Sequence, residues 1–95
     1  MVCVSLELIA HVLQRLFTRG ISVADVEETI HQGSIIKRYD DDKPFPSVLL
    51  LHFVLERPLH PVVAQDPATG ICVAVTVYEP DPLLWNADFT EKIRT

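Results

Sequence analysis

The hydrophobic pattern of this chain changes its period once, at Gly33, and that change limits the fold more than any other feature. Before Gly33, apolar residues recur every three or four positions, which is typical of helices that pack by one side. After Gly33, apolar residues form continuous runs or alternate singly, as in residues 71–78, which is typical of β-strands. The order predicts two helices followed by a sheet, an α+β arrangement.

The first half of the chain predicts two helices, over residues 5–18 and 22–32. Gly20 is placed to end the first helix in a left-handed conformation, and Ser22 is placed to cap the second. The short connection predicts an αα-hairpin. The apolar stripe expected on the first helix consists of Leu6, Ile9, Leu13, Leu16 and Phe17.

The second half predicts four strands with short connections, which favour antiparallel pairing. We therefore expect the two helices to pack on one face of a four-stranded antiparallel sheet. Residues 82–94 are expected to form a turn or short helix that Trp85 and Phe89 hold against the core. The four strands are expected at residues 34–39, 47–55, 59–65 and 71–78.

The chain has 95 residues, which is enough for one domain and too few for two. We expect a single domain over residues 1–95. This packing predicts a core shared by both helices and three strands. Its expected members are Leu13, Leu16, Val26, Ile30, Leu49, Leu51, Val63, Val75 and Val77.

The composition of the chain indicates its cellular compartment and limits the partners that it can bind. No apolar run approaches the ~20 residues of a membrane span, and the N-terminus has no signal-peptide pattern, so we expect a cytoplasmic protein without membrane contact. In a reducing compartment, Cys3 and Cys72 are expected to be free thiols. Too few clustered Cys and His residues are present for a zinc site, and we expect neither metal nor cofactor. The net charge of −5 argues against non-specific nucleic-acid binding, although a small basic site is compatible with it.

Three side chains of the first predicted helix form a polar row. His11, Arg15 and Arg19 are spaced by four residues and project from one side of the helix. Such a row is typical of a solvated helix face. The alternative is a site in which His transfers a proton near neutral pH and Arg binds a phosphate with its planar fork.

A second group lies on the predicted sheet. His60 follows Arg57 and Pro58 at the start of a strand, and Tyr78 ends the last strand. Each residue also fits a structural role, as a hydrogen-bonded histidine, a turn arginine or a half-buried tyrosine. Together, the histidines, arginines and tyrosine of the two groups are a metal-free set suited to general acid-base cleavage of RNA, with arginine stabilising the charge on phosphorus.

Four motifs, in their order along the chain, resemble those of domain-of-unknown-function family 4258. The resemblance implies a small bacterial protein similar to toxins of the RelE and barnase-like ribonuclease group, with a small zinc-finger or helix-turn-helix antitoxin as partner. It implies His11, His60 and Tyr78 as catalytic residues and Arg15, Arg19 and Arg57 as substrate-binding residues. Pro61 departs from the Val-Val that follows the histidine in the family. The motifs are His11…Arg15…Arg19-Gly20-Ile21-Ser22, Tyr39-Asp40-Asp41-Asp42-Lys43-Pro44-Phe45-Pro46-Ser47, Arg57-Pro58-Leu59-His60 and Thr76-Val77-Tyr78-Glu79-Pro80-Asp81-Pro82.

The sequence is compatible with three functions. The first is a metal-independent endoribonuclease toxin, which requires His11, Arg15, His60 and Tyr78 to converge on one groove. The second is a non-catalytic module that binds a partner protein through a sheet edge or an apolar patch. The third is an inactive relative of such toxins. The sequence leaves the oligomeric state open.

Overall fold

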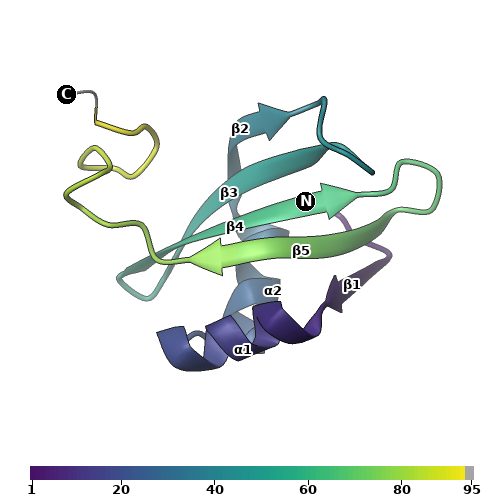
Figure 1. Ribbon diagram of the computed structural model, residues 1–95. Coiled ribbons are helices and arrows are strands. Elements are labelled where there is room, and N and C mark those ends of the chain that lie inside the picture. The colour runs from purple at the N-terminus through teal and green to yellow at the C-terminus, as the bar shows by residue number, and fades with distance from the viewer. Residues whose placement is uncertain (94–95) are drawn as a thin grey trace.

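The computed structural model describes residues 1–93 and has two helices and a five-stranded mixed sheet. Figure 1 shows the helices below the sheet and the C-terminal segment beyond the end of β5, on the other side. The α+β class is confirmed, whereas the expected sheet of four antiparallel strands is wrong. The elements, in chain order, are β1 (Ser5–Leu8), α1 (Ala10–Arg19), α2 (Val23–Gln32), β2 (Ser34–Tyr39), β3 (Ser47–Val54), β4 (Arg57–Gln65) and β5 (Ile71–Tyr78).

The additional strand is β1, which occupies residues predicted to be helical. Leu6 and Leu8 are partly buried, whereas Ser5 and Glu7 are exposed, so the segment alternates with the period of a strand. β1 pairs in parallel with β5, and the remaining neighbours pair antiparallel in the order β1-β5-β4-β3-β2. Leu6 fits the period of a helix as well as that of a strand, and the sequence prediction placed it in a helix.

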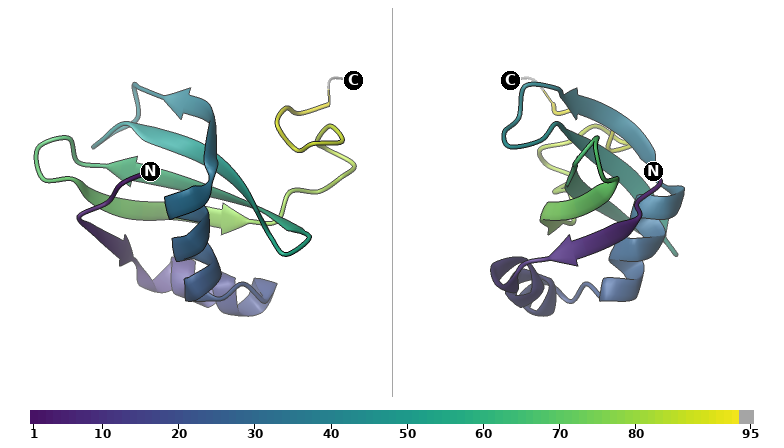
Figure 2. Two further views of the ribbon diagram at one scale, coloured as in Figure 1. Left: turned by 180° about the vertical axis from the view of Figure 1, so that it is seen from behind. Right: turned by 90° about the vertical axis from the view of Figure 1, so that its right-hand side faces the viewer.

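The two helices lie on the same face of the sheet, over different strands. α1 packs on β5, and α2 packs on β3 and β4. Gly20 ends α1 with φ of 65°, as predicted. The Ser22 hydroxyl accepts a hydrogen bond from the Asp25 amide at 3.0 Å, which confirms the predicted cap of α2. Figure 2 shows the helices from behind and from the side.

Seven of the nine predicted core residues are buried, five of them in the core between the helices and the sheet and two, Leu49 and Leu51, outside that cluster; the other two predictions are corrected. Leu13 is 42% exposed, because α1 packs on the sheet through the buried residues Val12 and Leu16. Val75 is 47% exposed, because the β4–β5 register shifts there: Val62 pairs with Thr76 and Val63 with Ala74, so Val75 is an extra residue. The residues confirmed as buried are Leu16, Val26, Ile30, Leu49, Leu51, Val63 and Val77.

The prediction that Cys3 and Cys72 are free thiols is wrong, since they form a disulfide. They are 69 residues apart in the chain, and only the parallel pairing of β1 with β5 brings them together. Without β1, no sequence pattern placed the two cysteines side by side. Within residues 1–93, no helix is long and apolar enough to cross a membrane.

The C-terminal segment, residues 79–93, folds back on itself without forming a helix. Trp85 pairs with Lys92 in an isolated antiparallel bridge, and the Ile93 amide donates to the Leu84 carbonyl at 2.9 Å. Trp85 is buried, as its predicted anchoring role requires, and the Phe89 ring meets Phe53 of β3 edge to face. Arg94, the last residue of the predicted 82–94 element, lies outside the described residues.

Candidate functional site

The two faces of the sheet separate the residues that were expected to form one site. Leu59 and Val63 of β4 belong to the core under the helices. His60 therefore points to the other side, because side chains alternate along a strand. There it contacts Tyr78 and Trp85. We call this side the open face, since neither helix covers it.

His11 and Arg15 remain on the helix side. They line a small cavity of about 130 Å³ between α1 and β5, together with Val75 and Thr76. Both side chains are exposed. The structure thus brings His11 together with Arg15, and His60 together with Tyr78, but it places the two pairs on opposite faces of the sheet.

The other two predicted arginines are engaged in structural contacts. The Arg19 guanidinium donates to the Val77 carbonyl at 2.6 Å. Arg57 donates to the Gly20 and Arg19 carbonyls at 2.7 and 2.8 Å and forms an ion pair with Glu79. Arg57 thereby satisfies carbonyl groups at the end of α1 that have no partner within the helix. These contacts join α1 to β4 and to the end of β5.

The open face carries a groove of about 450 Å³ between the sheet and the C-terminal segment. Its lining comes from strands β2, β3 and β5 and from the C-terminal segment. This open-face groove is a concave surface of the size that small ligands occupy. Its lining residues are Ile36, Lys37, Tyr39, Leu49, Tyr78, Trp85, Thr90, Glu91 and Lys92.

Tyr78 connects the open-face groove to the buried His60. The Tyr78 hydroxyl lies 3.3 Å from His60 Nδ1, and His60 Nε2 lies 2.9 Å from the Phe89 carbonyl oxygen. A carbonyl only accepts, so Nε2 carries the proton, and in the neutral ring Nδ1 accepts the proton of Tyr78. The Trp85 ring stands edge to face against the imidazole, with centroids 4.4 Å apart, and holds its orientation.

Burial keeps this pair uncharged at neutral pH. It lowers the pKa of the His60 imidazole below its ordinary value, and the hydrogen bond to the Phe89 carbonyl opposes this effect in part. Burial also raises the pKa of the Tyr78 phenol, and the nearby Tyr39 adds to the rise. The hydroxyl of Tyr78 therefore presents its oxygen as an acceptor to a molecule in the groove.

Two lysines of the open-face groove each lie near an aromatic ring on the same element. Lys37 Nζ lies 5.3 Å from the Tyr39 ring centroid on β2, and Lys92 Nζ lies 5.9 Å from the Trp85 ring centroid on the C-terminal segment. His60 and Tyr78 were predicted from their residue types, whereas these lysine–aromatic pairs were not. The available signal was the alternation of β2, which places Lys37 and Tyr39 on one face.

Comparison with known proteins places the chain in one family. The model of the family described as Domain of unknown function (DUF4258) matches residues 8–79, so the chain belongs to that family. No curated protein and no solved structure matches the chain. The expected RelE- or barnase-like fold therefore remains a prediction.

Proposed function

We propose that this chain is a toxin-like, metal-independent endoribonuclease and that single-stranded RNA binds in the open-face groove. The observation that carries the proposal is the Tyr78–His60 pair, in which a groove-lining hydroxyl is hydrogen-bonded to a buried imidazole nitrogen free to accept a proton. The resemblance of the family to RelE- and barnase-like toxins supports the choice of RNA as substrate.

The proposed reaction is attack of a ribose 2′-oxygen on the adjacent phosphorus. The 2′-hydroxyl gives its proton to the Tyr78 oxygen, and Tyr78 passes its own proton to His60 Nδ1. The 2′-oxygen–phosphorus bond forms and the bond to the 5′-oxygen breaks, leaving a 2′,3′-cyclic phosphate. The 5′-oxygen takes a proton from water. The Phe89 carbonyl stabilises the positive charge that develops on His60.

The walls of the open-face groove suit a short single strand. Lys37 and Lys92 carry the positive charges that a phosphate requires, and they do so on a chain whose net charge is −5. Tyr39 and Tyr78 offer rings on which bases stack. The Glu91 carboxylate accepts hydrogen bonds from base amino groups. These positions replace Arg15, Arg19 and Arg57 in the proposed substrate site.

The test is cleavage of a short single-stranded RNA by the purified protein in the presence of a chelator. We expect products that end in a 2′,3′-cyclic phosphate and a 5′-hydroxyl, identified by mass spectrometry. The matched control is the same RNA with every 2′-oxygen methylated, which has no nucleophile. Cleavage of the methylated RNA, or no cleavage of the unmodified RNA, would refute the proposal.

A second candidate is a non-catalytic module that binds a partner protein, such as a small antitoxin-like protein. One observation favours it: Ile9, Leu13 and Phe17 are exposed and lie four residues apart along one side of the α1 region, with Phe17 87% exposed. This function predicts that expression does not arrest growth and that a His60→Ala variant still binds the partner. Growth arrest that requires Tyr78 would exclude it as the sole function.

A further inference from the structure

β1 is a short strand at the edge of the sheet and has one neighbour. Its four residues pair in parallel with β5, from Ser5 opposite Ile71 to Leu8 opposite Ala74. Figures 1 and 2 show β1 at the margin of the sheet, directly before α1. A four-residue parallel pairing is weak by itself, so other contacts must hold β1 in place.

The side chains of β1 define what the edge of β5 accepts. Leu6 and Leu8 pack against the core cluster, whereas Ser5 and Glu7 face solvent. The site under β1 therefore takes an extended segment with apolar side chains at alternate positions. A hollow of about 250 Å³ between β1 and α2, lined by Leu6 and Ile30, shows that the segment is not packed tightly on its α2 side.

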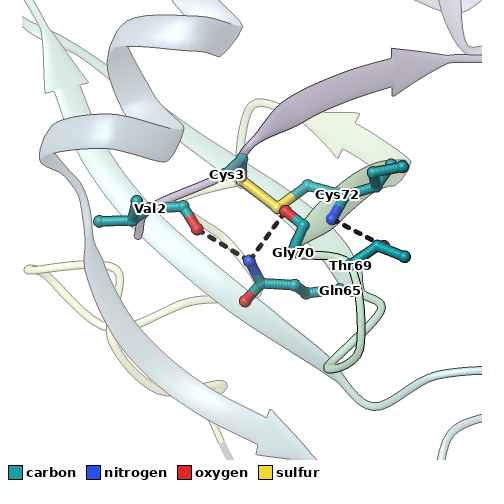
Figure 3. Close-up of a disulfide and its surroundings, with 7 residues drawn as sticks. Val2, Cys3, Gln65, Thr69, Gly70 and Cys72 are labelled. Carbon is teal, nitrogen blue, oxygen red and sulfur yellow. Dashed lines mark hydrogen bonds between the residues drawn. A yellow bond between two sulfur atoms is a disulfide. The ribbon is translucent and has the colours of Figure 1, made fainter.

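The N-terminal end of β1 is fastened by a covalent bond. Cys3, which is partly exposed, is bonded to the fully buried Cys72 of β5. Figure 3 shows the disulfide beside Gln65, whose side-chain amide donates to the Val2 and Gly70 carbonyls at 2.8 and 3.3 Å. These contacts fix the register in which Cys3 meets Cys72.

The C-terminal end of β1 is attached to α1 through one residue. Ile9 is extended, with φ −73° and ψ 160°, and its side chain makes no capping hydrogen bond to α1. Rotation about this residue can move β1 away from β5 without removing a side-chain cap from α1. Val12 and Leu16 anchor α1 in the core through contacts that do not involve Ile9.

We propose that the edge of β5 is a strand-accepting site that the β1 strand of a second copy of this chain can fill. A second copy carries the same alternation of Leu6 and Leu8, and it carries Cys3 in the register that meets Cys72. Two chains that exchange β1 strands form the same contacts as two separate chains and gain an interface between copies.

The covalent step conserves the number of disulfides. A small-molecule thiolate attacks the Cys3 sulfur, because Cys72 is buried, and Cys72 leaves as a thiolate. The Cys72 thiolate of the second copy then attacks the Cys3 sulfur and expels the small thiol. When both copies react, two intramolecular disulfides become two intermolecular ones, and the thiol is regenerated.

The test pairs two variants of the full chain that cannot form the bond within one chain. A tagged Cys3→Ser protein keeps only Cys72, and an untagged Cys72→Ser protein keeps only Cys3. They are mixed in a glutathione redox buffer. We expect a covalent heterodimer on a non-reducing gel, joined through Cys3 and Cys72 by peptide mapping and lost on reduction. Homodimers at least as abundant as the heterodimer would overturn the proposal.

The matched control introduces Leu6→Lys into the Cys72→Ser chain. This change leaves Cys3 in place but removes the apolar side chain that packs at the strand-accepting site, so we expect at least tenfold less heterodimer. An unchanged yield would contradict the proposal, because the cysteines would then be reacting without strand exchange.

A second experiment uses the wild-type chain in case the serine variants do not fold. Isotopically heavy and light proteins are incubated together with a catalytic amount of glutathione and then separated without reduction. We expect disulfide-linked heavy–light dimers by mass spectrometry, at a yield that rises with protein concentration. Finding only monomers at millimolar protein would rule out exchange.

Discussion

The two faces of the sheet use the same kinds of residue for different purposes. On the helix side, Arg19 and Arg57 are engaged by backbone carbonyls and hold α1 against the sheet. On the open face, a buried histidine supports a tyrosine that lines a groove with two lysines. The comparison teaches that residue type alone does not assign a function, and that the partners of each side chain decide it.

The largest expected effect on stability is at His60. His60→Ala removes a fully buried ring and leaves the Phe89 carbonyl without its donor, so we expect a loss of about 4 kcal/mol in the free energy of unfolding. Urea denaturation measures it. His60→Gln is the matched variant, since it keeps a polar side chain, and it should lose less. Equal stability of His60→Ala and wild type would contradict the role of His60 in holding the C-terminal segment.

The helix side is tested by a pair of leucines on α1. Leu16→Ala removes a buried side chain and should cost about 3 kcal/mol, whereas Leu13→Ala removes a partly exposed one and should cost less than about 1 kcal/mol. Both values come from urea denaturation. If the order is reversed, α1 is rotated from the orientation described above.

Substitutions of Arg57 test whether its hydrogen bonds and ion pair stabilise the fold. Arg57→Ala should lower the free energy of unfolding by about 2 kcal/mol, because two carbonyls and the Glu79 carboxylate lose a charged donor. Arg57→Lys should recover only part of the loss, since lysine lacks the planar fork. RNA cleavage per folded molecule should remain unchanged in both variants. A loss of cleavage without a loss of stability would instead indicate that Arg57 binds the substrate.

The pH dependence of stability tests the environment of His60. Its pKa is lowered in the folded protein, so the unfolded chain binds the proton more readily. The stabilising contribution is complete above the unfolded pKa of about 6.5 and is lost as pH falls through the folded pKa. We expect a slope of at most about 1.4 kcal/mol per pH unit in this window, which His60→Gln should abolish. A slope that persists in His60→Gln belongs to other groups.

Local patterns predicted much of the fold but not its assembly. The Ser22 cap and the apolar runs located α2 and the strands from β2 onward, because these signals lie within a few residues of one another. β1 was missed because four residues carry too little periodicity to compete with a helical interpretation. The Cys3–Cys72 disulfide depended on β1 and was missed with it.

The candidate site was predicted in part for the same reason. His60 and Tyr78 were identified by their chemistry, and they pair across β4 and β5. Their separation from His11 follows from which face of β4 turns to the helices, and that is fixed by packing rather than by local sequence. Lys92 was missed because it reaches the groove only when the C-terminal segment folds over the sheet.

The most direct test of the open face as the functional face is the rate of RNA cleavage by Tyr78→Phe compared with His11→Ala. Tyr78→Phe removes one hydroxyl and keeps the ring, and His11→Ala changes an exposed side chain on α1. We predict that kcat/KM falls by about 10²- to 10⁴-fold in Tyr78→Phe, the usual scale for losing a proton-transfer group, and by less than about twofold in His11→Ala. The opposite result, with full activity in Tyr78→Phe and a large loss in His11→Ala, would place the functional site on the helix side and contradict the account.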